Sequence, residues 1–180
     1  MNKIILSTLY AGMLTLPAIA DVFDDNKQGF IVGLGIGLTS IATELDSNNR
    51  TLLDDRSAGM ATSFKLGYAF NEQFLLYYTN QVDWYTFNDS STQVGLTGIG
   101  ADYYIASTSG LYVSSMLGFA SISDINNYGV STGSGFGVGV GYDLLPHMSV
   151  EAEYMHINIE ENTAEVDTDS LRVKFQYTWY

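Results

Sequence analysis

The chain of 180 residues contains no cysteine, only two prolines and only seven lysine and arginine residues. The absence of cysteine excludes disulfide bonds and thiolate metal sites. Because contacts to phosphate need Lys and Arg, the formal net charge of −13 argues against nucleic acid as a partner. The abundant residues are instead glycine (18) and tyrosine (13), a composition that favours β-strands with glycine-marked bends. The length fits one domain.

The first twenty residues differ in composition from the rest of the chain. A positive start at Lys3 precedes a mostly apolar stretch, Ile4 to Leu16, and Ala18-Ile19-Ala20 has the small residues of a cleavage site. We interpret residues 1–20 as a secretory signal peptide and residues 21–180 as the mature domain. The alternative is an N-terminal membrane anchor, but the apolar stretch is shorter than the roughly 20 residues of a spanning helix.

Residues 134–143, SGFGVGVGYD, place glycine at every second position. The dinucleotide pattern G-x-G-x-x-G followed by a helix is absent, and no Gly-Lys-Ser/Thr follows as in a phosphate loop. The remaining interpretation is a β-strand with one apolar face and one glycine face. Alternation of this kind predicts eight strands, at 29–45, 58–70, 74–86, 93–106, 111–123, 134–143, 148–160 and 170–180.

Two of the predicted strands are irregular. In residues 93–106 the apolar Val94 and Leu96 fall out of phase, which a β-bulge near Gly95 or Gly98 would correct. In residues 148–160 the phase slips after Tyr154, at three apolar residues: Met155, Ile157 and Ile159.

The connections between the predicted strands alternate in length. Short turns are expected at 71–73, 107–110 and 145–147, and longer polar loops near 46–57, 87–92, 124–132 and 161–169. This arrangement is typical of an up-and-down transmembrane barrel. We therefore predict an all-β fold, an eight-stranded antiparallel up-and-down transmembrane β-barrel with both termini on the short-turn side, the periplasm.

The large apolar residues are expected to face lipid, and the small and charged residues to face the barrel interior. Gly, Ala, Ser and Thr cannot fill the core of a soluble sandwich, which is the alternative fold, but they suit the narrow interior of eight strands. Asn80 and Ser115 are exceptions on the apolar face. The aromatic residues expected to form interfacial girdles are Tyr68, Phe70, Phe74, Tyr103, Tyr104, Tyr177 and Trp179.

Seven ionisable residues fall on the inward phase of these strands. Glu151 and Glu153 lie on the strand that precedes Arg172 and Lys174, so cross-strand pairing is expected. Buried charges need partners, and we predict a salt-bridge network that fills the lumen; the alternative is the selectivity lining of a narrow pore. The members of this predicted interior charge network are Lys65, Asp83, Asp102, Glu151, Glu153, Arg172 and Lys174.

The chain resembles the small eight-stranded outer-membrane proteins of Gram-negative bacteria, the OmpA/OmpX-like barrel superfamily. Four stretches carry the resemblance besides the signal peptide: GYAFNEQFLLYY at 67–78, GIGADYYI at 98–105, GVGYDLLPHMSVEAEY at 139–154 and KFQYTWY at 174–180. The resemblance implies a location in the cell outer membrane and contact with its lipid and lipopolysaccharide. It also implies assembly by the barrel-assembly machinery through the C-terminal strand, in which the lipid-facing phase ends at Trp179.

The function expected on this basis is a structural or surface-interaction role for a monomeric barrel, without catalysis, cofactor or metal. The alternative is a narrow porin-like channel for small solutes. An enzyme is the third possibility, because His147-Met148-Ser149 and Glu161 resemble residues of an eight-stranded lipid A deacylase. However, a strand of about 3.3 Å per residue separates Ser149 from Glu161, so these residues are expected to lie too far apart to form a catalytic triad.

The acidic residues of the predicted loops are interpreted as solvated surface. The alternative is that divalent cations bridge them to lipopolysaccharide. These residues are Glu44, Asp46, Asp54, Asp55, Glu160, Glu161, Glu165, Asp167 and Asp169.

Overall fold

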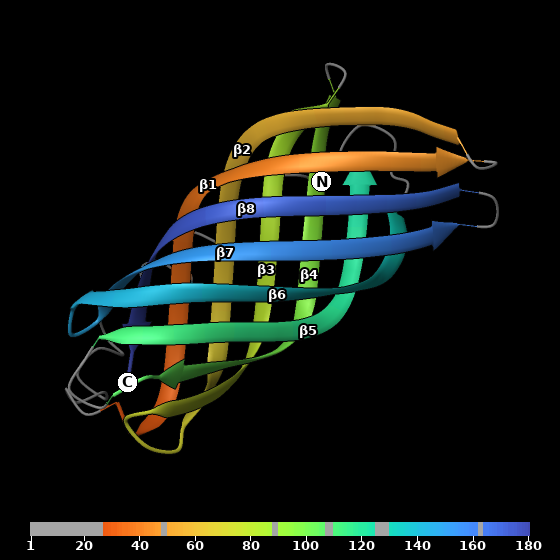
Figure 1. The fold of residues 1–180 in the computed structure, drawn as a ribbon. Coiled ribbons are helices and arrows are strands. Elements are labelled where there is room, and N and C mark those ends of the chain that lie inside the picture. The colour runs from red at the N-terminus through yellow and green to blue at the C-terminus, as the bar shows by residue number, and fades with distance from the viewer. Residues whose placement is uncertain (1–26, 48–49, 88–89, 107–109, 125–129, 162–163) are drawn as a thin grey trace, which may run out of the picture.

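The computed structural model describes residues 27–47, 50–87, 90–106, 110–124, 130–161 and 164–180, so the predicted signal peptide and its cleavage site lie outside it. Eight strands close into one barrel in chain order, and the first pairs with the last (Figure 1). Every pair is antiparallel, as predicted. The strands are β1 (Gly29–Ser47), β2 (Arg50–Ala69), β3 (Phe74–Phe87), β4 (Ser90–Tyr104), β5 (Leu111–Asp124), β6 (Val130–Leu145), β7 (Met148–Glu161) and β8 (Ala164–Trp179).

The strands are longer than predicted at the end of the barrel opposite the short turns. β1 and β2 remain paired as far as Ser47 and Arg50, so most of the loop expected at 46–57 is strand. β7 and β8 remain paired as far as Glu161 and Ala164, and much of the loop expected at 161–169 is strand as well. The prediction of long loops was wrong here, because polar residues on both faces are compatible with a strand pair that extends beyond the apolar belt.

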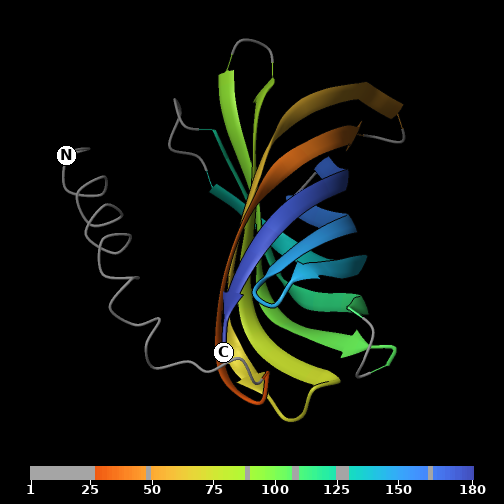
Figure 2. The ribbon, with the colours of Figure 1, turned by 90° about the vertical axis from the view of Figure 1, so that its left-hand side faces the viewer.

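The short turns expected at 71–73 and 145–147 lie between β2 and β3 and between β6 and β7, and most of the turn expected at 107–110 lies outside the described residues. In the first of them, the Asn71 side-chain oxygen accepts hydrogen bonds from the backbone N–H groups of Gln73 and Phe74, both at 2.8 Å. Such an Asx turn reverses the chain within a few residues. Figure 2 shows the strands curving strongly around the barrel between this end and the opposite one. Among the described residues, no helix has the length and apolar character that crossing a bilayer requires.

The outward face of the barrel carries the large apolar side chains. Phe119 is 81 % exposed and Leu38 is 74 % exposed, values that a soluble protein would not repeat on every strand. Rings in edge and tilted contact, with centroids 5.4 to 5.8 Å apart, form part of a girdle at the short-turn end: Phe30, Tyr68, Phe70 and Phe74. Tyr104, which was expected in the girdle, instead points inward and is 6 % exposed.

Neither of the predicted irregularities occurs. The register of β4 with both neighbours runs without a shift, and Val94 and Leu96 are fully buried inside the barrel. β7 likewise keeps its phase past Tyr154. The apolar residues that seemed out of phase point into the barrel. The interior therefore contains bulky apolar side chains as well as small and charged ones. The register shifts that do occur lie between Leu45 and Asp46 and between Asp143 and Leu145.

The glycines of β6 make room for side chains of neighbouring strands. A Cβ at Gly141 would lie 2.1 Å from Cζ of Tyr112, whose ring occupies the space above the glycine. Between β4 and β5, Gly98 and Gly118 are direct partners, and a Cβ on either would lie within 3 Å of the other's Cα. Glycine is therefore required for side-chain packing at the first position and for close backbone approach at the second.

Candidate functional site

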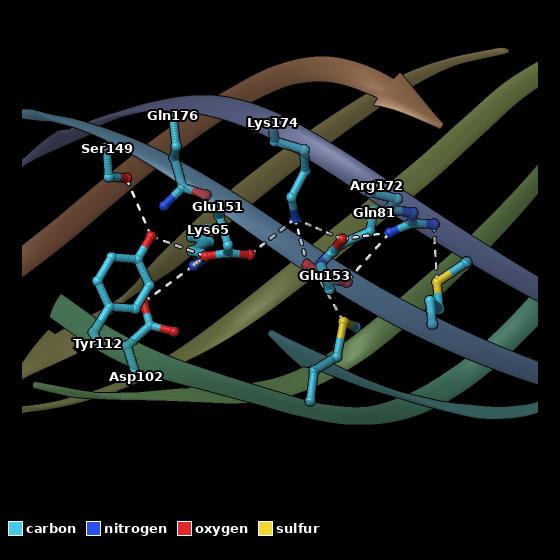
Figure 3. Close-up of polar contacts among 12 residues, drawn as sticks. Lys65, Gln81, Asp102, Tyr112, Ser149, Glu151, Glu153, Arg172, Lys174 and Gln176 are labelled. Carbon is cyan, nitrogen blue, oxygen red and sulfur yellow. Dashed lines mark hydrogen bonds and ion pairs between the residues drawn. The ribbon is translucent and has the colours of Figure 1, made fainter. Parts of the chain in front are cut away.

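The seven ionisable residues of the interior meet in one continuous chain of contacts, and Figure 3 shows all of them except Asp83. All are at most 4 % exposed. Glu151 on β7 lies directly opposite Lys174 on β8, and Glu153 lies directly opposite Arg172. We call this set the ion-pair chain; in order of contact its members are Asp102, Lys65, Glu151, Lys174, Glu153, Arg172 and Asp83.

Neutral side chains complete the hydrogen bonding of the ion-pair chain. Gln81 on β3 accepts hydrogen bonds from Arg172 and Lys174 through its side-chain oxygen and donates to Glu153 at 3.2 Å. Tyr77 donates its hydroxyl proton to Asp102 at 2.6 Å, and Tyr112 donates to Glu151 at 3.0 Å. Buried charges are tolerated when they are paired and hydrogen-bonded in this way.

An apolar layer lies between the ion-pair chain and the end of the barrel opposite the short turns. Arg172 contacts it, because its Nη2 lies 2.9 Å from Sδ of Met155. The buried members of the layer are Ile41, Tyr85, Val94, Leu96, Met116, Ala120, Met155, Ile157 and Ile159. The sequence contained the signal for this layer, since β4 and β7 each place apolar residues in phase with inward charges.

An aromatic layer lies on the other side of the ion-pair chain, at the short-turn end. Tyr104 and Tyr112 have ring centroids 5.0 Å apart, and Tyr77 and Tyr180 belong to the same buried cluster. Lys27 forms an ion pair with Asp143 at the rim and lies 3.7 Å from the Tyr104 ring centroid. A cavity of about 10 Å³ reaches from this rim to Lys65 and Asp102; this is about the volume that one water needs.

A polar cluster occupies the outward face beyond the apolar belt. Tyr154 and His156 on β7 both contact Oδ1 of Asp169 on β8, at 2.5 and 2.9 Å. Asn158 donates to Asp167 at 2.9 Å. Desolvation opposes ionisation of Asp169, but the hydrogen bonds from Tyr154 and His156 outweigh it and lower the pKa of that carboxyl below its ordinary value.

The residues of the enzyme alternative do not meet. Ser149 is buried, and its hydroxyl oxygen lies within hydrogen-bond distance, 3.2 Å, of the Tyr112 hydroxyl oxygen. His147 contacts the carbonyl oxygen of Thr178 and packs against Tyr180. The Glu161 side chain lies outside the described part of the structure, but its place on β7 is twelve residues from Ser149, about 40 Å along a strand.

The acidic residues at the end of the barrel opposite the short turns form no metal site within the described part of the chain. Only Asp167 and Asp169 of the predicted acidic loop positions have described side chains, and both hydrogen-bond to β7. Within the described residues, no group of three His, Asp or Glu side chains is arranged so that it could bind a metal ion.

Comparison with known proteins identifies the barrel. The family model described as "Outer membrane protein beta-barrel domain" matches residues 6–178. The chain belongs to this family. A search of the curated proteins finds no match to the sequence. Membership of this family makes the chain an outer-membrane protein. In the usual orientation of such barrels, the short-turn end faces the periplasm.

Solved structures with the same fold are distant in sequence. The attachment invasion locus protein Ail of Yersinia pestis is 16 % identical with a TM-score of 0.53, over 83 % of this chain and 99 % of Ail. Neisserial surface protein A is 17 % identical with a TM-score of 0.53, over 80 % of this chain and 96 % of the other. Ail has also been solved with the heparin analogue sucrose octasulfate. Neither name is that of an enzyme, and at this identity the likeness shows the fold alone.

Proposed function

We propose that this outer-membrane barrel has a closed lumen and acts through its surface, in a structural or surface-interaction role, without transporting solutes and without catalysis. The observation that carries the proposal is the stacking of three layers inside the barrel: the apolar layer, the ion-pair chain and the aromatic layer. Together they span the interior from one end of the belt to the other. The cavity between Asp102 and the rim has room for about one water, so it supports no path for a solute.

Planar-bilayer recording tests the closed lumen. The purified mature barrel is first shown to be folded by its shift on an unheated SDS gel, and is then added to a bilayer with a general porin as positive control. We expect no discrete openings. Stepwise conductance from the folded protein would favour the narrow channel instead.

Mass spectrometry of lipid A tests the absence of catalysis. Lipid A from cells with and without the protein should show the same acyl pattern, and a changed pattern would indicate an enzyme.

We further propose that the barrel is monomeric. We also propose that it contacts lipopolysaccharide at the polar cluster around His156 and Asp169, because this cluster faces outward at the external edge of the apolar belt. Vesicles with lipopolysaccharide in the outer leaflet should raise the temperature at which the barrel unfolds, relative to phospholipid vesicles. An equal unfolding temperature would count against this contact.

We propose that the barrel-assembly machinery reads the last strand through its outward aromatic residues. Tyr177 and Trp179 are adjacent on the outward phase of β8, with ring centroids 4.6 Å apart, whereas Tyr180 is buried in the aromatic layer. Tyr177→Ala should therefore lower the amount of folded barrel in cells more than it lowers refolding of the purified protein in detergent. Equal losses in the two settings would contradict a role in recognition.

A further inference from the structure

The ion-pair chain begins and ends with a carboxyl group. Lys65 contacts Asp102 at 3.1 Å and Glu151 at 3.4 Å, and Lys174 contacts Glu151 at 3.2 Å and also Glu153. Arg172 completes the chain to Asp83 at 2.7 Å. Four carboxyl groups thus share three cationic groups, which gives one more negative than positive charge when every group is ionised.

The described surroundings of Asp102 supply no fourth cation. The groups that face it are Lys65 on β2, the neutral phenols Tyr77 on β3 and Tyr112 on β5, and Glu151 on β7. Lys174 on β8 contacts Glu151 and Glu153 rather than Asp102. At the rim, Asp143 on β6 is already paired with Lys27, and β1 contributes the uncharged Ile31. An uncompensated charge at such a depth is strongly unfavourable.

The two ends of the ion-pair chain are not equivalent. Asp83 receives two N–H groups of the Arg172 guanidinium on one oxygen, Oδ2, at 3.0 and 2.7 Å, and each is a hydrogen bond between two charged groups. Asp102 receives a single ammonium group, and that group is shared with Glu151. The excess negative charge is therefore compensated least at Asp102.

We propose that Asp102 is a proton-binding site, and that its carboxyl group carries one proton in the folded barrel at neutral pH. The bound proton makes the number of positive and negative charges inside the barrel equal. Both oxygens of a protonated carboxyl can still accept hydrogen bonds, so the contacts from Tyr77 and Lys65 persist.

The proton exchanges with the periplasmic side. The small cavity that is lined by Lys65, Asp102 and Tyr112 continues to Asp143 and Tyr180 at the short-turn rim. In the other direction the apolar layer follows the ion-pair chain. The barrel therefore responds to periplasmic acidity through Asp102.

Infrared spectroscopy of the folded barrel detects the proton directly. The wild-type protein should show the carbonyl stretch of one protonated carboxylic acid at neutral pH, and the band should be lost in Asp102→Asn. It should persist in Asp169→Asn, a control that removes a carboxyl group outside the ion-pair chain. Absence of the band in the wild type would overturn the proposal; its persistence in Asp102→Asn would overturn the assignment to Asp102.

Stability against pH provides a second readout. Asp102→Asn replaces a neutral acid by a neutral amide, so it should unfold at the wild-type urea concentration in acid, where Asp102 of the unfolded chain is protonated too. At higher pH the unfolded wild type releases the proton that the folded barrel holds, so the wild type should unfold at progressively lower urea as the pH rises to neutral, whereas the variant should not. Glu151→Gln, which leaves two lysines short of a partner, should lower the midpoint at every pH. If Asp102→Asn behaved like Glu151→Gln, Asp102 would be an ordinary ion-pair partner. Neither the infrared nor the unfolding experiment measures conductance, so their outcomes do not depend on whether the lumen is closed.

Discussion

Arg172 and Val173 are neighbours in β8, yet they lie in opposite environments. Arg172 is charged and 2 % exposed, and Val173 is apolar and 53 % exposed. In a soluble protein the two exposures would be exchanged. The difference shows that the solvent outside the wall is hydrocarbon, and that the interior is where polar groups find partners. Substitutions at these two positions test the two environments separately.

The largest loss of stability is expected from a substitution inside the barrel. Arg172→Met leaves Asp83 buried without a cation, and breaking a buried ion pair by removal of one partner costs about 3–5 kcal/mol. Urea unfolding in detergent micelles, followed by the shift on an unheated SDS gel, measures this loss. The double variant Asp83→Asn/Arg172→Met removes both charges and should recover a large part of the free energy of unfolding. A double variant no more stable than Arg172→Met would contradict the pairing.

The next largest loss of stability is expected from a substitution on the lipid-facing wall of the barrel. Val173→Arg places a charge on the lipid-facing wall near the middle of the apolar belt, where arginine costs about 2–4 kcal/mol. Thr132→Arg is the matched control, because Thr132 is also outward and exposed but pairs with the polar Ser121 nearer the end of the barrel, where the cost is about 0–1 kcal/mol. Unfolding in phospholipid vesicles measures both. Equal costs at the two positions would show that the wall around Val173 is not in hydrocarbon.

The outward face was predictable from the sequence because its solvent is uniform. Every lipid-facing residue of β1 from Phe30 to Leu38 meets the same hydrocarbon, so simple alternation identifies strand, phase and fold. The seven inward charges follow from the same phase. Their pairing partners across the lumen, such as Lys65 with Asp102 on a strand two places away, do not follow, because they depend on how the closed barrel brings distant strands together.

The interior was harder to predict because its composition changes with depth. Leu96 and Ile157 are inward, like Asp102 and Glu153 on the same strands, but they lie in the apolar layer. Alternation alone assigns apolar residues to lipid, and so it suggested a bulge and a phase slip that do not exist. The rule that failed is that the inward face must be small or polar; the interior of a narrow barrel also accepts bulky apolar side chains wherever glycines opposite leave space.

A smaller effect is expected where those glycines are replaced. Gly141→Ala puts a methyl group 2.1 Å from the Tyr112 ring, which must move and disturb its hydrogen bond to Glu151. Overpacking of this kind costs about 1–3 kcal/mol. Gly95→Ala is the control, because its Cβ would have neighbours no closer than 3.4 Å. A Gly141→Ala barrel as stable as Gly95→Ala would show that the ring has room to move.

The smallest effect is expected in the polar cluster beyond the belt. Hydrogen bonds from Tyr154 and His156 lower the pKa of Asp169 in the folded barrel, so the ionised carboxylate contributes stability above its unfolded pKa, and this contribution is lost as the pH falls through the folded value. Because the Asp169 side chain is 48 % exposed, the contribution is only about 0.2–1 kcal/mol. Asp169→Asn should therefore be slightly less stable than the wild type at neutral pH and equally stable in acid. A difference that widened toward acid pH would reverse the sign and show that the carboxyl is protonated in the folded barrel.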